Sequence, residues 1–139
     1  MPDYAGDLSA KEAWELLARE PEAVLIDVRT RPEWQFVGVP DLSDLGRQAV
    51  LISWQNYPGM ERNESFVDAV KAQGVTPNTP ILFLCRSGGR SRSAAIAATA
   101  AGFGRCYNVA GGFEGNHDSE RHRGTIGGWK VAGLPWAQE

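Results

Sequence analysis

Cysteine is scarce in this sequence, and long apolar or charged runs are absent. Only two of the 139 residues are cysteines, and they form no Cys-x-x-Cys pair, which excludes a disulfide framework. The net charge of -3 lacks the basic excess that a nucleic-acid surface needs, so we expect no nucleic-acid partner. Residues 93–102, the most apolar-leaning stretch, are too few to span a bilayer, and no basic-then-apolar leader begins the chain. We therefore expect a cytoplasmic protein without membrane contact.

The composition is that of one ordinary globular domain. Apolar residues make up 42% of the chain and charged residues 22%, which is typical of a folded protein with a hydrophobic core. Apolar runs that do not alternate with polar residues predict buried strands at residues 23–28, 49–54, 80–84 and, more weakly, 106–109. Helices are predicted at residues 10–19, 64–73 and 91–101. A capping box of Ser9 and Glu12 begins the first helix.

The order of these elements predicts the fold class. Strands that alternate with helices form parallel pairs through right-handed crossovers. We expect an α/β fold with a mostly parallel sheet of about five strands and helices on both faces. In such sheets the ligand site lies at the carboxyl ends of the strands. Cys85 directly follows the strand predicted at 80–84, so it becomes the candidate catalytic residue.

The charges next to Cys85 favour a reactive sulfur. The thiol would face the positive end of the following helix, which favours thiolate over thiol. Arg86 and Arg90 add positive charge in the same loop. A cysteine that only fills the core needs no such neighbours, so we interpret Cys85 as a nucleophile.

The small residues of the same loop predict a cradle for an anion. Gly88 and Gly89 allow the backbone to curl until several N–H groups point inward. Ser87 and Ser91 offer hydroxyl groups, although Ser91 fits equally well as the N-cap of the next helix. Four residues separate Cys85 from the loop arginine, and phosphatases with a related loop carry a longer one that admits a phosphate. The short loop therefore favours a single sulfur atom over a phosphoryl group.

The loop and its flanking motifs resemble the rhodanese family, in particular its single-domain sulfurtransferases. The similarity covers about residues 9–136, in the family's order, and predicts one rhodanese-like domain over 1–139. The motifs that carry it are Leu25-Ile26-Asp27-Val28-Arg29, Pro32-Glu33-Trp34 with Gly38, Tyr107-Asn108-Val109, Gly111-Gly112-Phe113, Gly128-Trp129 and Gly133-Leu134-Pro135. After Gly38 the sequence Val39-Pro40-Asp41 departs from the usual family pattern.

This resemblance implies a sulfur-transfer reaction at Cys85. The Cys85 thiolate would take a sulfane sulfur from thiosulfate or a persulfide donor and pass it to a thiol, to cyanide or to a protein acceptor. Backbone N–H groups of residues 86–91 would stabilise the persulfide, and Arg86 and Arg90 suit a donor with two oxygens. Neither a cofactor nor a metal is implied. The alternative is a persulfide-carrying or sensing module that serves a protein partner and turns over small donors slowly.

Several residues have a structural and a functional interpretation. For Asp27 and Arg29 we favour an ion pair that supports the neighbouring loops over direct catalysis. Cys106 is expected in the core. Trp34, Trp54 and Tyr57 are candidates for the pocket mouth, although at least two of them fit core or rim positions better.

Residues 114–125 form a polar excursion, expected to overhang the active-site face. The segment contains four potential metal ligands, but its two histidines, five positions apart, do not stack on one helical face and no cysteine joins them, so we expect no metal there. These ligands are His117, Asp118, Glu120 and His122.

Overall fold

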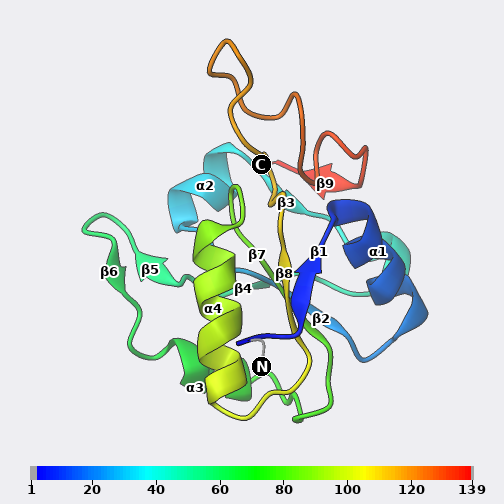
Figure 1. The fold of residues 1–139 in the computed structure, drawn as a ribbon, viewed down its shortest axis with the longest axis vertical. Helices are drawn as coiled ribbons and strands as arrows, with labels where there is room; N and C mark the ends of the chain where they lie inside the picture. Colours follow the sequence, from blue (N-terminus) through cyan, green and yellow to red (C-terminus); the bar gives the residue numbers. More distant parts are fainter. Residues whose placement is uncertain (1–2, 139) are drawn as a thin grey trace.

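Five parallel strands form the central sheet of the computed structural model, which describes residues 3–138 (Figure 1). The order across the sheet is β1-β8-β7-β2-β4, and every neighbouring pair is parallel. The predicted fold class is therefore confirmed. The bounds of the strands are β1 Gly6–Leu8, β2 Val24–Asp27, β4 Val50–Leu51, β7 Ile81–Leu84 and β8 Cys106–Val109.

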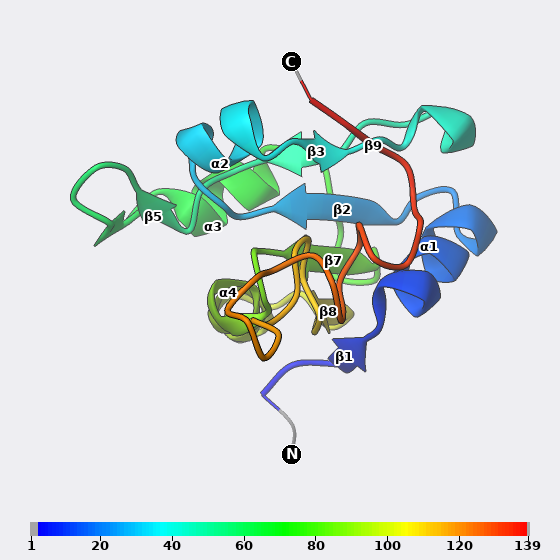
Figure 2. The ribbon, with the colours of Figure 1, turned by 90° about the horizontal axis from the view of Figure 1, so that it is seen from above.

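Two apolar clusters cover the two faces of the sheet. Alternate residues of a strand point to opposite faces, and in β7 Phe83 joins one cluster while Leu82 joins the other. Helices α3 (Phe66–Lys71) and α4 (Gly89–Ala100) pack on the first face, and α1 (Ala10–Arg19) packs on the second. The arrangement is visible from above in Figure 2. All four residues of β7 are buried, which explains the unbroken apolar run in the sequence.

The helix boundaries differ from the predicted ones at functionally important places. The capping box of Ser9 and Glu12 is present at the start of α1, as predicted. Helix α4 begins at Gly89, two residues before the predicted start at Ser91, because Gly88 adopts a left-handed conformation with φ 110° that turns the chain directly into the helix. Ser91 therefore lies inside the helix, and its interpretation as the N-cap is wrong. Helix α3 is shorter than the predicted 64–73.

Short elements surround the sheet, and most of them were not predicted. Helix α2 (Arg31–Phe36) follows β2, and the predicted strand at 49–54 is reduced to β4 at the edge of the sheet. A 3-10 turn, η1, occupies Ser43–Leu45. Two small antiparallel pairs complete the structure: β3 (Val39–Pro40) with β9 (Trp136–Ala137), and β5 (Gln55–Asn56) with β6 (Glu61–Arg62). Within residues 3–138, no helix has the length and apolar character needed to cross a bilayer.

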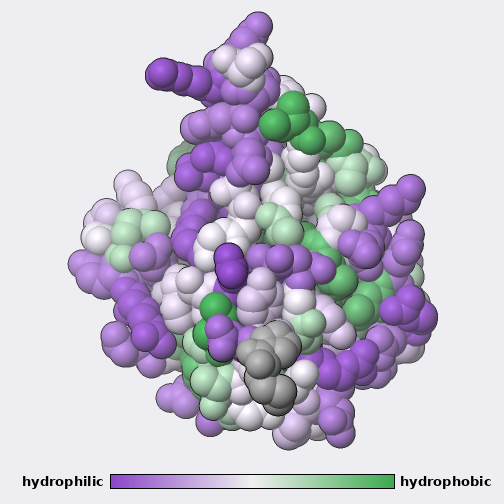
Figure 3. Space-filling view, viewed as in Figure 1, coloured by the Kyte–Doolittle hydropathy of each residue, from purple (hydrophilic) through white to green (hydrophobic). Residues whose placement is uncertain are grey.

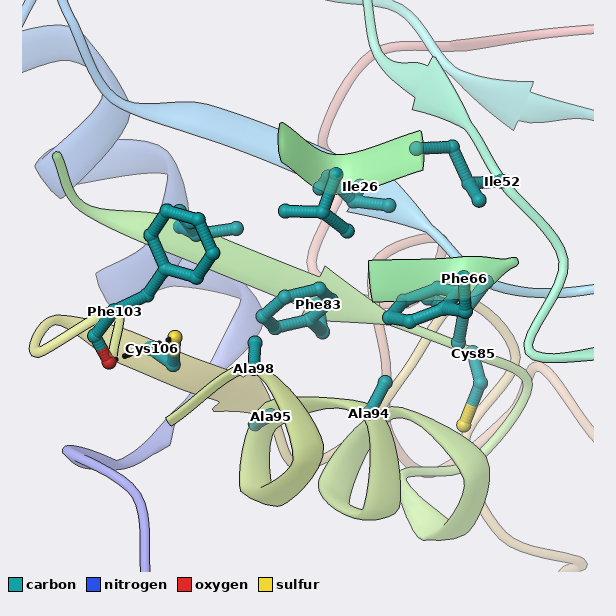
Figure 4. Packing of buried hydrophobic residues seen from close by; sticks show 13 residues of the cluster. Ile26, Ile52, Phe66, Phe83, Cys85, Ala94, Ala95, Ala98, Phe103 and Cys106 are labelled. Carbon is teal, nitrogen blue, oxygen red and sulfur yellow. Dashed lines mark hydrogen bonds between the residues drawn. The ribbon is translucent and has the colours of Figure 1, made fainter. Parts of the chain in front are cut away.

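Cys106 belongs to the core, as predicted. It begins β8 and is fully buried in the cluster that α4 covers, at the other end of that cluster from Cys85 (Figure 4). Its thiol donates a hydrogen bond to the Phe103 carbonyl, with 3.4 Å between sulfur and oxygen. Burial raises the pKa of the Cys106 thiol to about 11.

This buried thiol should make the fold sensitive to alkali. A pKa raised above the ordinary 9.0 stabilises the native state fully below that value, and the stabilisation is lost as the pH rises toward 11. We expect the free energy of unfolding to fall between about pH 8 and pH 10.5 by about 2 kcal/mol more in the wild type than in Cys106→Ala. Urea unfolding at the two pH values measures the difference, and equal losses in both proteins would refute it.

Candidate active site

Cys85 lies directly after β7, where the chain turns toward α4. Its side chain is 1% exposed. The sulfur accepts a hydrogen bond from the backbone N–H of Gly88 at 3.1 Å, and the Ser91 hydroxyl lies 3.2 Å from it. Figure 4 shows the sulfur beside the first turn of α4. The structure thus brings Cys85, Gly88 and Ser91 together.

The loop curls tightly because Gly88 has no side chain. A Cβ atom at this position would lie 2.3 Å from the carbonyl oxygen of Ala110, and φ of 110° is a conformation that other residues rarely adopt. Gly89, in contrast, is the first residue of α4 and has open space at its Cβ position. Of the two loop glycines, Gly88 is therefore the one that the cradle requires.

A second glycine turn supports the loop from outside. The backbone N–H of Phe113 donates to the carbonyl of Cys85 at 2.8 Å, and that of Glu114 donates to the carbonyl of Arg86 at 3.0 Å. Gly112 makes this approach possible, since a Cβ there would lie 2.5–2.6 Å from the same two carbonyl oxygens. Both carbonyls are therefore engaged by this turn, while the N–H of Gly88 donates to the sulfur.

Arg90 is held by Glu33, which sequence reasoning placed in a family motif but gave no role. The guanidinium nitrogens Nη1 and Nη2 donate to the two carboxylate oxygens at 2.7 and 2.9 Å. Glu33 also accepts hydrogen bonds from the backbone N–H and hydroxyl of Thr30. Arg86, by comparison, is exposed. The Thr30-x-x-Glu33 spacing at the start of α2 was the available sequence signal, because it is a capping-box pattern.

Burial alone would raise the pKa of Glu33, but the hydrogen bonds and charge of Arg90 outweigh it and hold that pKa below its ordinary value. Arg90 is affected in the opposite sense. Its hydrogen bonds to Glu33 raise its pKa, and attraction to Cys85 acts in the same direction. The guanidinium of Arg90 therefore stays charged in the loop that begins at Cys85.

Asp27 and Arg29 form a fully buried ion pair with 2.6 Å between Nη2 and Oδ2. The same Nη2 donates to the carbonyl of Gly38 at 2.7 Å, and the guanidinium carbon lies 4.3 Å from the centre of the Phe113 ring. The pair thus ties the end of β2 to the turn at Gly38 and to the glycine turn that supports the loop. These contacts agree with the supporting interpretation favoured from the sequence.

A polar chain leads away from Cys85 through Ser91 to Asn108 and Asp7, and sequence reasoning gave the last two no role. The Ser91 hydroxyl lies 2.5 Å from Oδ1 of Asn108 in β8, and Nδ2 of Asn108 donates to Asp7 of β1 at 3.0 Å. Asn108 is 3% exposed. The pairing of β8 with β7 places Asn108 opposite Phe83, two residues before Cys85, and no local pattern reveals that register.

The aromatic candidates for the pocket mouth divide into two groups. Trp54 packs edge-on against Phe66, with 5.1 Å between ring centres, and serves the core. Trp34 lines a hollow of about 540 Å³ beside α2 and β9, and none of residues 85–91 lines that hollow. Tyr57 is 63% exposed. Trp34 and Tyr57 thus line a hollow to which residues 85–91 do not contribute, and Trp54 belongs to the core cluster.

Residues 114–125 project beyond the carboxyl end of the sheet (Figure 1), and the projection is mostly hydrophilic (Figure 3). Asp118 organises it by accepting hydrogen bonds from the backbone of Glu120 and His122 and from the Thr125 hydroxyl. Among the residues that the structure describes, no three His, Cys, Asp or Glu side chains are grouped as metal ligands. The Asp118 carboxylate thus stabilises the conformation of this loop.

Comparison with known proteins identifies the family of this chain. A family model described as the STR4 middle domain matches residues 5–139. The chain is 30% identical over 132 residues to the protein THYLAKOID RHODANESE-LIKE, chloroplastic, of Oryza sativa subsp. indica, a match covering 94% of this chain and 25% of the rice protein. This chain belongs to the rhodanese-like family. Membership in this family indicates sulfur transfer as the general class of reaction.

Other known proteins match this rhodanese-like protein over most of their length. The crystal structure of Rv0390 from M. tuberculosis is 49% identical, with a TM-score of 0.87 over 98% of this chain and 99% of that one. An uncharacterised protein of Rickettsia conorii is 38% identical over 130 residues, covering 94% of this chain and 95% of the relative. The polysulfide-sulfur transferase homodimer of Wolinella succinogenes shares the fold, with a TM-score of 0.66, 24% identity and coverage of 99% and 80%.

The support at Gly112 can be tested against a matched glycine. Gly46 has a similar φ of 70°, but nothing lies within 4 Å of its Cβ position. We expect Gly46→Ala to lower the free energy of unfolding by about 1 kcal/mol, the cost of the left-handed conformation alone. Gly112→Ala should cost at least about 3 kcal/mol, because its methyl group also displaces the backbone of Cys85 and Arg86. Urea unfolding compares the two variants, and equal losses would contradict the role of Gly112 in supporting the loop.

The pair of Glu33 and Arg90 should stabilise the fold only when Glu33 is charged. We expect Glu33→Gln to lower the free energy of unfolding at neutral pH by about 1–2 kcal/mol. Since the pKa of Glu33 is lowered in the native state, this stabilisation is complete above 4.5 and is lost as the pH falls through the lower value. The difference from wild type should therefore shrink in acid, as measured by urea unfolding.

The control is Glu15→Gln, which removes the charge of an exposed carboxylate on α1. This variant should match the wild type at both pH values. A loss in Glu33→Gln that persists undiminished in acid would show that the ion pair is not its cause.

Proposed function

We propose that this protein is a sulfurtransferase that moves a sulfane sulfur from thiosulfate or a persulfide donor to a thiol or cyanide acceptor through a persulfide on Cys85. The observation that carries the proposal is the placement of the Cys85 sulfur against the N–H of Gly88 and the hydroxyl of Ser91. A hydrogen-bond donor aimed at a buried sulfur stabilises it most when the sulfur is negatively charged. Such an environment suits both a thiolate and a persulfide anion.

The first half-reaction forms the persulfide. After the thiol proton has left to solvent, the Cys85 thiolate attacks the outer sulfur of thiosulfate. A new sulfur–sulfur bond forms, the bond within thiosulfate breaks, and its electron pair leaves with sulfite. The N–H of Gly88 already donates to the sulfur before the reaction, so it would stabilise the charged sulfur without reorganising. No cofactor is needed, because the donor supplies the sulfane sulfur.

The second half-reaction returns the enzyme to its starting state. A thiolate or cyanide attacks the outer sulfur, takes it as a persulfide or thiocyanate, and the electron pair of the broken bond returns to Cys85. The exposed Arg86 is the loop guanidinium that would pair with two oxygens of a donor. Arg90 contributes its charge, because its terminal nitrogens are engaged by Glu33.

The second candidate is a persulfide-carrying or sensing module that acts through a protein partner. The observation that favours it is the burial of Cys85, which leaves 1% of the residue exposed. The hydrophilic projection at residues 114–125 begins next to the loop and offers a surface for a partner (Figure 3). In this case the persulfide forms on Cys85, but small acceptors remove it slowly.

A sulfite-release assay with thiosulfate and cyanide tests the proposal. We expect wild type to turn over and Cys85→Ser to lose about a thousandfold or more, because serine forms no persulfide. Cys106→Ser is the matched control and should retain turnover. Intact mass and peptide mapping after exposure to thiosulfate should place one extra sulfur on Cys85 and none on Cys106.

The outcomes separate the two candidates. A persulfide on Cys85 without turnover of cyanide would favour the carrier module. Wild type that turns over no faster than Cys85→Ser and carries no extra sulfur on Cys85 would refute both.

A further inference from the structure

The Ser91 hydroxyl lies between two acceptors and carries one hydrogen. Its oxygen is 2.5 Å from Oδ1 of Asn108 and 3.2 Å from the sulfur of Cys85. Ser91 is fully buried and Asn108 is 3% exposed, so water does not readily replace either partner. A hydroxyl hydrogen can serve one acceptor fully at a time. The direction in which Ser91 donates therefore depends on which of the two, Asn108 or Cys85, is the stronger acceptor.

Asp7 determines which atom Asn108 presents to Ser91. A carboxylate can only accept hydrogen bonds, and Asp7 Oδ1 lies 3.0 Å from Nδ2 of Asn108 and 2.9 Å from the hydroxyl of Tyr4. The amide NH₂ must face Asp7, which leaves Oδ1 facing Ser91. An amide oxygen is an acceptor only, so it competes with Cys85 for the hydrogen of Ser91.

The competition has a different outcome in the two protonation states of Cys85. A thiol can donate to Ser91, while Ser91 donates to Asn108, and all the groups are satisfied. A thiolate has no hydrogen, so Ser91 must turn toward the sulfur and leave Oδ1 of Asn108 without a donor. Losing the partner of a buried acceptor is costly. Formation of the thiolate therefore breaks a hydrogen bond within the protein.

We propose that Asn108 is a positioning residue that holds the Ser91 hydroxyl away from Cys85 and so restrains the nucleophilicity of its sulfur, with Asp7 fixing the amide. The proposal rests on the proposed function in that it concerns the same reactive sulfur. Arg90 acts in the opposite sense, because its guanidinium attracts the thiolate, and the buried Asp27 carboxylate acts in turn on Arg90. Asn108 in β8 and Arg90 in α4 thus act on the Cys85 sulfur in opposite senses.

The test is the rate at which iodoacetamide alkylates Cys85 at neutral pH, followed by peptide mass. Asn108→Leu keeps the side-chain volume but removes the acceptor, so Ser91 is free to donate to the thiolate. We expect alkylation about fivefold faster than in wild type. Ser91→Ala removes the donor together with its bond to Asn108, so it should be alkylated within about twofold of the wild-type rate. Because alkylation requires no sulfur transfer, its result is independent of the thiosulfate assay.

A double variant separates positioning from a merely structural effect. If Asn108 acts through Ser91, Asn108→Leu should change the rate by less than about twofold when Ser91→Ala is already present. An equal acceleration without Ser91 would overturn the proposal, as would slower alkylation in the single variant Asn108→Leu.

A second pair of variants leaves the buried residues unchanged. Asp7 is exposed, and Asp7→Asn removes its charge but keeps an oxygen that can accept from Asn108. Asp7→Ala removes both, so the amide of Asn108 is free to rotate and release Ser91. We expect Asp7→Ala to be alkylated about threefold faster than Asp7→Asn. Equal rates would show that Asp7 does not orient the amide.

Discussion

The close approach of two backbone turns is the constraint on which the site depends. The loop after β7 and the turn after β8 touch through Gly88 against Ala110 and through Gly112 against the carbonyls of Cys85 and Arg86. Neither contact leaves space for a Cβ atom. The contact is possible because β7 and β8 are parallel neighbours, so both chains leave the sheet at the same edge. Sheet topology thus shapes the cradle, and the two glycines permit it.

The parts of the site that could be predicted from the sequence are those with a local signal. The position of Cys85 followed from an apolar strand that ends at Leu84 and from glycines that precede a helix. The core position of Cys106 followed from its place in a short apolar strand. The start of α4 was misplaced because the left-handed conformation of Gly88, which begins the helix early, cannot be distinguished in sequence from an ordinary loop glycine.

The remaining parts depend on contacts between residues far apart in the chain. Glu33 meets Arg90 across 57 positions, and Asp7 meets Asn108 across 101. Strand β1 has three residues and no apolar run, so its pairing with β8 could not be predicted. The electrostatic balance at Cys85 is set by such long-range partners, whereas the sequence motif around Cys85 shows only the loop's own arginines.

The anchoring of the projection has a mechanical consequence. The carbonyl of Arg86 accepts hydrogen bonds from the backbone of both Glu114 and Gly115, the first residues of the polar segment 114–125. The residue next to Cys85 therefore also anchors the base of the projection. A displacement of Glu114 or Gly115, for example when a partner binds the projection, would be transmitted through these two hydrogen bonds to the peptide next to Cys85.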